Sequence, residues 1–179
     1  MRGTIVLPLS KSPFPRGRVG PETWQDWYRG AVRANKFAIS TPNSEVLILS
    51  NMTYDGVSEV GKYIWAFNQI DIKTPLRVIR ECTETIGQIN FLFKYAKSEG
   101  KDIIIVSTFL HYLRVQWLIW QNPLSRKVRY KHYAAWGIPR PREAVTDIIL
   151  IFLFPLLDIF GLRDRFLRAV HQHRALGKL

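Results

Sequence analysis

The sequence predicts an α/β protein: a three-layer sandwich in which helices cover both faces of a mostly parallel β-sheet. Two observations carry this prediction. Residues 103–106 are four consecutive β-branched residues, a continuous apolar run typical of a central strand buried on both faces. Short apolar runs also alternate with longer segments of helical periodicity along most of the chain. This alternation favours parallel strands joined by crossover helices.

The expected strands are short runs rich in apolar and β-branched residues. They cover residues 4–9, 45–49, 76–79, 103–106 and 128–135. Between them, Pro21 suits the first position of a helix, and Asp55 is expected to cap the next one. Thr83 or Thr85 is expected to cap the third helix, and Gly100 to stop it.

The fourth helix follows the central strand directly. Ser107 and Thr108 end the apolar run and are expected to cap this helix. Its apolar residues form one stripe at helical spacing, namely Leu110, Leu113, Trp117 and Trp120. The central strand and this helix form the unit around which the rest of the chain is organised.

Composition narrows the choice of partner. The chain has 179 residues, of which 47% are hydrophobic, and a net charge of +12. That charge favours an anionic partner: a phosphorylated metabolite, a membrane surface or nucleic acid. Nucleic acid is the least favoured, because the basic residues are scattered and no binding module is recognisable. The single cysteine, Cys82, excludes an internal disulfide and a cysteine-cluster zinc site. We expect a cytoplasmic protein, and the sequence carries no signal for its oligomeric state.

The C-terminal segment, residues 144–179, differs from the domain expected over residues 1–143. Its apolar run, 148–157, is too short to span a membrane, which takes about 20 residues. Pro155 is expected to kink or end that helix. A basic amphipathic helix follows over 162–174. Two interpretations stay open: a helix buried against the sheet with a solvated tail, or peripheral contact with the inner face of the membrane.

Polar residues cluster where the predicted strands end. In open α/β sheets, ligands bind beyond the carboxyl ends of the strands. The polar residues expected there come from four strands: Ser10, Ser50, Asn51, Glu81, Ser107, Thr108, His111 and Arg114. A compact sheet would bring them to one edge, so we interpret them as a candidate binding site.

Three of these residues are candidates for chemistry. Glu81 is the only carboxylate expected at a strand end, which suits a general base or a hydroxyl binder; the alternative is an ion pair with Arg80 or Arg114. His111 and Arg114 are three residues apart and therefore neighbours on the helix surface. Arg114 can grip an oxyanion, and His111 can donate to it or act as a general acid. The alternative for His111 is a core or capping histidine.

Several other sites are not supported by the sequence. It contains no GxGxxG dinucleotide loop, no GxxxxGK[ST] phosphate loop and no GxSxG elbow. The four histidines show no metal-ligand spacing, so no metal site is expected.

The order of these residues resembles the YdcF/SanA/ElyC-type domain family over residues 46–120. Glu81 and Thr85 match the glutamate and threonine that precede the central strand in that family, and His111 and Arg114 match its H-x-x-R-A motif. Residues 85–88 lack the glutamate and asparagine of the family's T-x-E-N, and Val115 replaces the alanine. The resemblance implies a Rossmann-like domain with a polar site at the strand ends, S-adenosylmethionine binding in one branch, and a link with bacterial envelope metabolism.

Together these inferences predict a domain that binds an anionic small ligand, phosphorylated or nucleotide-like. Glu81 and His111 are the expected catalytic residues if it is an enzyme. The expected ligand-binding residues are Ser10, Ser50, Asn51, Thr85, Ser107, Thr108 and Arg114. The alternative is a non-catalytic module attached to a membrane surface or a protein partner through residues 144–179.

Overall fold

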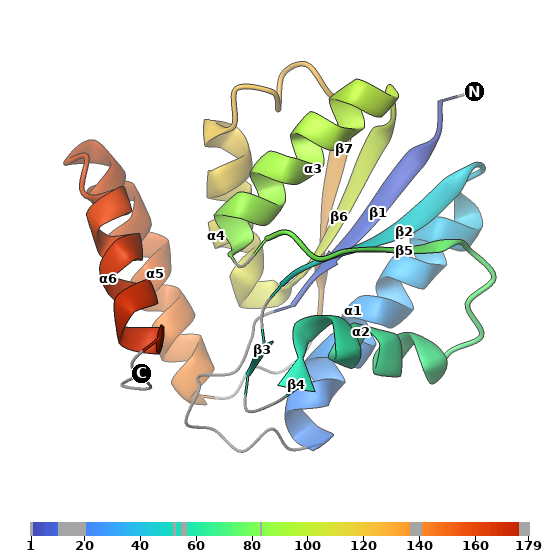
Figure 1. The fold of residues 1–179 in the computed structure, drawn as a ribbon, viewed down its shortest axis with the longest axis horizontal. Coiled ribbons are helices and arrows are strands. Elements are labelled where there is room, and N and C mark those ends of the chain that lie inside the picture. Colours follow the sequence, from blue (N-terminus) through green and yellow to red (C-terminus); the bar gives the residue numbers. More distant parts are fainter. Residues whose placement is uncertain are drawn as a thin grey trace.

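A five-stranded, wholly parallel sheet lies at the centre of the molecule (Figure 1). The computed structural model describes residues 2–10, 21–51, 53–54, 57–82, 84–136 and 141–175. Across the sheet, the strand order is β5-β2-β1-β6-β7. The strands are β1 (Thr4–Leu9), β2 (Ser44–Leu49), β5 (Leu76–Ile79), β6 (Asp102–Thr108) and β7 (Tyr130–Ala135). A small antiparallel pair, β3 (Thr53–Tyr54) and β4 (Val57–Ser58), precedes the second helix.

Helices cover both faces of this sheet. On one face lie α1 (Pro21–Ser40) and α2 (Glu59–Asn68), and on the other α3 (Thr85–Glu99) and α4 (Phe109–Gln121). Two further helices, α5 (Pro141–Ile159) and α6 (Arg163–Ala175), lie outside α4 (Figure 1). The predicted three-layer, Rossmann-like α/β fold is confirmed.

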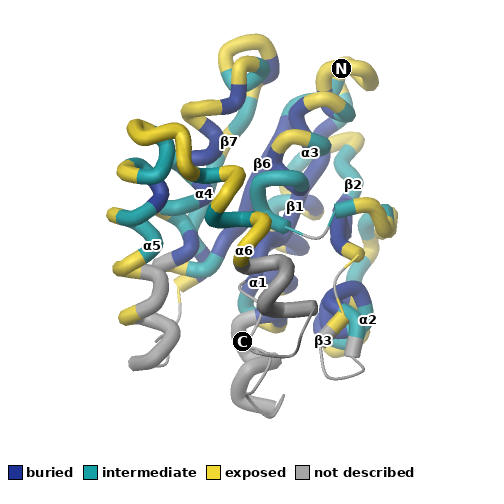
Figure 2. Tube along the Cα trace, turned by 60° about the vertical axis from the view of Figure 1, so that its left-hand side comes forward, coloured by how far each residue is buried: buried dark blue, intermediate teal, exposed yellow. Residues whose placement is uncertain are grey.

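The central strand β6 is buried on both faces, as its β-branched run predicts. Ile103 and Ile105 pack with α3 and α4, whereas Ile104 and Val106 pack with α1 and α2. Figure 2 shows the resulting buried centre along β1 and β6. The alternation follows from the period of two in a strand, which sends successive side chains to opposite faces.

Helix α1 begins at Pro21 as predicted, whereas the caps of α2 and α3 differ from those predicted. Helix α2 is capped by Ser58, whose Oγ accepts a hydrogen bond from the N–H of Gly61 at 2.9 Å. The prediction of Asp55 as the cap is therefore wrong, and Asp55 lies outside the described residues. At α3 the cap position belongs to Glu84, and Thr85 is already helical. Gly100 ends α3 with a φ of 62°, the left-handed conformation expected of a glycine stop.

Of the two residues predicted to cap α4, Thr108 occupies the cap position and Ser107 does not. Thr83 lies outside the described residues. Ser107 belongs to β6, and Thr108 occupies the cap position of α4 without a side-chain capping hydrogen bond. In a parallel sheet the neighbouring strands provide partners through the end of β6, so the strand continues to Thr108.

The predicted apolar stripe of α4 is not the side of the helix that packs on the protein. The residues that α4 buries are Val115, Leu118 and Ile119, whereas Leu113 and Trp120 are exposed. The side chain of Leu110 lies outside the described residues. Helix α4 is apolar on two sides, and periodicity alone does not say which side meets the sheet.

In the described part of the chain, the main contacts of α5 are with α4 and α6 and not with the sheet, so the interpretation of a helix buried there is wrong. Helix α5 packs against α4 instead, and it continues through Pro155 to Ile159. Hydrogen bonds join α5 to α4 at Asp158 of α5, which accepts from Trp117 Nε1 at 2.8 Å and from Gln121 Nε2 at 2.7 Å, both on α4. Among the described residues, no helix is long and apolar enough to cross a membrane.

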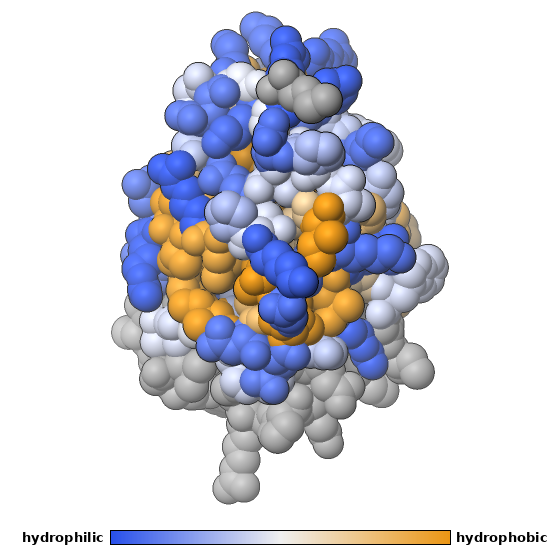
Figure 3. All heavy atoms as spheres, turned by 90° about the vertical axis from the view of Figure 1, so that its right-hand side faces the viewer, coloured by the Kyte–Doolittle hydropathy of each residue, from blue (hydrophilic) through white to orange (hydrophobic). Residues whose placement is uncertain are grey.

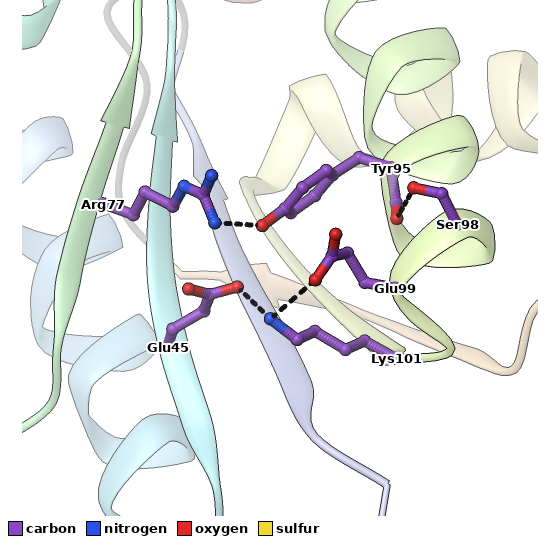
Figure 4. Close-up of polar contacts among 6 residues, drawn as sticks. All are labelled: Glu45, Arg77, Tyr95, Ser98, Glu99 and Lys101. Carbon is purple, nitrogen blue, oxygen red and sulfur yellow. Dashed lines mark hydrogen bonds and ion pairs between the residues drawn. The ribbon is translucent and has the colours of Figure 1, made fainter.

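The amino edge of the sheet is held by paired charges. The Lys101 ammonium lies 2.9 Å from Glu45 Oε1 and 3.9 Å from Glu99 Oε2 (Figure 4). The hydrogen bond from Lys101 to Glu45 raises the pKa of Lys101. Arg77 on β5 donates to the Tyr95 hydroxyl on α3 in the same view. These contacts join strands and helices, so this edge has a structural role.

Strand β5 forms one edge of the sheet and is poorly covered. Leu76 and Val78 are exposed there, on the side of α2. Figure 3 faces this part of the molecule and shows apolar side chains gathered in its middle, with polar ones around and across them. The short helix α2 leaves this end of the sheet uncovered.

Candidate functional site

The topological switch point of the sheet lies between β1 and β6. The chain leaves β1 for α1 on one face and leaves β6 for α4 on the other. In such sheets, ligands bind at the carboxyl ends of the strands beside this point. Leu9 and Ser107 are register partners there. Three serines therefore follow or end three adjacent strands: Ser50 on β2, Ser10 on β1 and Ser107 on β6.

A first polar group, the α2 cluster, lies on one side of the switch point and consists of Ser10, Ser50, Glu59, Lys62 and Tyr63. Glu59 is only 6% exposed and accepts a short hydrogen bond from the Ser50 hydroxyl. Lys62, one helical turn away, is completely buried. Its ammonium lies 5.4 Å from the centre of the Trp27 ring. Helix α2 thus carries two charged side chains into the interior at the ends of β1 and β2.

The surroundings of the α2 cluster shift the pKa of Glu59. Burial raises the pKa of Glu59 to about 7, although the hydrogen bond from Ser50 and the charge of Lys62 act in the opposite direction. A carboxyl group that titrates near neutral pH suits general acid–base chemistry. Sequence reasoning missed Glu59 as a site residue. The available signal was its position four residues before Tyr63, which places it on the buried face of α2.

Tyr63 links the α2 cluster to the end of β1. Its hydroxyl accepts from the Ser10 N–H at 2.7 Å and donates to the Pro8 carbonyl at 2.9 Å. Burial, together with the nearby Glu59, raises the pKa of the Tyr63 phenol. A Cβ at Gly30 of α1 would lie only 3.1 Å from Ser10 Oγ, so the glycine allows the helix to pack closely on this turn.

A second polar group, the α4 cluster, lies on the other side of the switch point and consists of Ser107, His111, Arg114, Gln116 and His132. Ser107 Oγ is 2.7 Å from His132 Nε2, and His132 Nδ1 is 2.9 Å from Gln116 Oε1. An amide oxygen only accepts, so Nδ1 carries the proton and Nε2 accepts from the serine. Burial lowers the pKa of His132 to about 4, which keeps the imidazole neutral.

This hydroxyl–imidazole–amide series has the connectivity of a nucleophile, a base and an orienting group. Its environment favours a structural role. Ser107 is completely buried, and an imidazole with a pKa of about 4 is a weak base at neutral pH. The ring of Tyr112 stacks on His132 with centroids 4.1 Å apart. The series therefore joins β6, β7 and α4.

His111 and Arg114 are neighbours, as their spacing predicts. Arg114 donates from Nη2 to His111 Nδ1 at 2.8 Å. A guanidinium has no acceptor, so Nδ1 of His111 is unprotonated and Nε2 carries its hydrogen. His111 is only 1% exposed, and the Arg114 guanidinium lies 5.9 Å from the centre of the Phe154 ring of α5. Both side chains are N–H donors, which is the chemistry that binds an oxyanion.

Glu81 lies apart from this pair. It follows the edge strand β5 and is exposed. Three strand spacings separate β5 from β6, about 14 Å at about 4.8 Å each. Asn51 is also exposed, and its N–H donates to the Cys82 carbonyl at 2.7 Å. The structure thus gathers the predicted residues of β1, β2 and β6 towards the centre and leaves Glu81 at the margin.

The two predicted threonines lie at helix starts on the α3 and α4 side. Thr85 is the first residue of α3, and Thr108 immediately precedes α4. Both are half-buried. Thr108 is beside the switch point, whereas Thr85 lies on the β5 side, near Glu81.

No group of three or more His, Cys, Asp or Glu side chains that could hold a metal ion occurs in the described part of the chain. No family model, curated protein or solved structure matches this chain.

Proposed function

We propose that this protein binds an anionic small molecule at the carboxyl edge of its sheet, over the ends of β2, β1 and β6. The observation that carries the proposal is the pair of polar clusters on opposite sides of the switch point, in which Glu59, Lys62 and His111 are buried. Burying ionisable groups such as Glu59, Lys62 and His111 costs free energy unless they are compensated. Their concentration at the edge where parallel sheets bind ligands favours a binding role.

The residues divide into two roles. Arg114 and the Nε2–H of His111 would hold an oxyanion, helped by the partial positive charge at the start of α4. Glu59, with a pKa of about 7, would exchange a proton with a ligand hydroxyl if the site is catalytic.

The position of Glu81 bears on ligand size. The strands that lead to Glu81 and to Arg114 are three spacings apart, about 14 Å between β5 and β6, so a ligand that touches both residues is an extended one. A nucleotide or nucleotide sugar has that length, and an isolated phosphate does not. The resemblance to the YdcF-type family adds S-adenosylmethionine to the candidates, and the family's link with envelope metabolism is the reason for testing prenyl phosphates.

A thermal-shift screen of the full chain tests the proposal. The panel contains nucleotides, nucleotide sugars, S-adenosylmethionine and prenyl phosphates. A ligand at about 100 times its Kd adds about 2.7 kcal/mol to the free energy of unfolding, which raises Tm by roughly 5–10 °C for a chain of this size. We expect Arg114→Ala to abolish the shift and Arg77→Ala, an arginine bonded to Tyr95 away from the site, to retain it. A silent panel, or a shift that survives in both Arg114→Ala and Glu59→Gln, would refute the proposal.

A further inference from the structure

The outer side of α5 is a continuous apolar stripe. All of its members are exposed, and their spacing places them on one side of the helix: Val145, Ile148, Ile149, Phe152, Leu156 and Ile159. From first to last they cover about 21 Å of helix, at about 1.5 Å per residue. We call this the α5 stripe. Such a run of exposed apolar side chains marks a contact surface, since isolated soluble domains rarely leave one uncovered.

The opposite side of α5 is the one that packs on the protein. Phe154 is only 8% exposed and lies between two guanidinium groups, at 5.9 Å from Arg114 and 5.7 Å from Arg163. It also meets the Phe166 ring of α6 edge-on, with centroids 6.2 Å apart. The α5 stripe therefore faces away from the domain, on the flank where α5 and α6 lie outside α4 (Figure 1).

Apolar side chains continue beyond the helix. Phe160 and Leu162 are exposed in the turn between α5 and α6. Trp120 of α4 is 66% exposed and meets Trp117 edge-on. Trp117 in turn donates to Asp158 of α5, which places this exposed indole beside the C-terminal end of α5. Exposed tryptophan is typical of side chains that lie at the headgroup level of a bilayer.

Charge distinguishes this surface from an ordinary apolar interface. Residues 159–179 contain five basic residues and one acidic residue. Arg165 and Arg168 of α6 are exposed, next to the apolar turn. Two acidic groups lie at the junction: Asp158 is neutralised by its ion pair with Arg163, and Asp164 is exposed in the first turn of α6. Apolar side chains with flanking arginines match the acyl boundary and the anionic headgroups of a lipid surface.

The turn between the helices holds this surface in one arrangement. Gly161 has a φ of 65°, and the Leu162 N–H donates to the Leu157 carbonyl at 2.7 Å. From the apolar stripe, the exposed tryptophan and the adjacent arginines, we infer that α5 and α6 dock on an anionic bilayer, with α5 lying in the plane of the interface. This inference is independent of the ligand proposed for the sheet edge.

Liposome flotation of the full chain tests the inference, with vesicles of phosphatidylcholine alone or with 30% phosphatidylglycerol, at low and high salt. We expect flotation with the anionic vesicles, and weaker flotation at high salt. The double variant Ile149→Ser, Phe152→Ser should lower the partition coefficient at least about tenfold, because two inserted side chains lose their burial. The matched control is Ile39→Ser on α1, because Ile39 is 60% exposed and Ile149 is 56% exposed.

A second pair of variants tests the charge. Arg165→Glu, Arg168→Glu should lower binding to anionic vesicles at least about tenfold, since each basic residue near the surface contributes about 1 kcal/mol. Lys94→Glu, Lys97→Glu is the control, because these two lysines are exposed at the same spacing on α3. Far-ultraviolet circular dichroism verifies that each variant is folded.

Three outcomes overturn the inference. The first is that the wild-type chain does not float with anionic vesicles at low salt. The second is that the Ile149, Phe152 variant floats like the wild type, which would mean non-specific charge attraction. The third is that light scattering shows a dimer that this variant dissociates, without flotation of the wild type; the α5 stripe would then bind a second copy of the chain.

Discussion

The buried carboxyl group of Glu59 should make the stability of this protein fall as the pH rises. Burial raises its pKa from 4.5 to about 7. Between pH 4.5 and about pH 7, Glu59 keeps its proton in the folded chain and has released it in the unfolded chain. The contribution of Glu59 to stability is therefore fully present below pH 4.5 and is lost as the pH rises through 7.

The size of the effect follows from the shift. Each pKa unit corresponds to 1.36 kcal/mol, so a rise from 4.5 to about 7 corresponds to about 3 kcal/mol of unfolding free energy between pH 4.5 and 8. The attraction of Lys62 and the hydrogen bond from Ser50 are already included in this pKa. Gln does not titrate, and its amide oxygen can still accept from Ser50. Glu59→Gln should therefore have nearly wild-type stability at pH 4.5 and be more stable than wild type by about 3 kcal/mol at pH 8.

Urea unfolding of both proteins at pH 5, 6, 7 and 8 measures this difference. Glu45→Gln is the control, because Glu45 is a carboxylate at the opposite edge that is paired with Lys101. We expect that control to lose stability at each of these pH values. A difference between wild type and Glu59→Gln that stays constant from pH 5 to 8 would refute the reasoning, because it would show that Glu59 ionises in the folded protein as in the unfolded one.

Further predictions concern His132 and two glycines. The pKa of His132 is lowered to about 4, so its contribution is present above pH 6.5 and lost as the pH falls through 4. His132→Leu should make Tm depend less on pH between pH 4 and 6.5. It should also lower the free energy of unfolding by about 1–3 kcal/mol at pH 7, because Ser107 and Gln116 lose their hydrogen-bond partner. Gly100→Ala should lower Tm by about 2–4 °C, because its φ of 62° costs an alanine about 1 kcal/mol. Gly87→Ala should raise Tm instead, because its Cβ would meet only Cys82, at 3.8 Å, inside a helix. Equal shifts for the two glycine variants would contradict the last two predictions.

Local patterns predicted the fold well because the fold rests on local signals. The run of residues 103–106 could be buried on both faces only as a central strand, and it is. Gly100 stops α3 in the left-handed conformation, and the spacing of His111 and Arg114 made them neighbours. Each of these features depends on residues within about one helical turn or one strand.

Other features depend on which surfaces of the helices and strands come into contact, and a local sequence pattern does not predict those contacts. Helix α4 could turn either of two apolar sides to the sheet, and packing chose Val115 and Ile119. The charge of Glu59 is buried only because α2 lies across the ends of β1 and β2, where Ser50 meets it. Glu81 is distant from His111 because β5 is an edge strand, a fact of strand order.

The sequence by itself therefore determined the strands, the crossover helices and the one edge at which polar groups collect. Tertiary structure decided which of those groups lie in the same cluster, how burial shifts the pKa of Glu59, and that the α5 stripe stays outside the core. The reason is physical. Secondary structure follows hydrogen bonds and side-chain periods of two or 3.6 residues, whereas burial and pKa follow contacts between segments far apart in the chain.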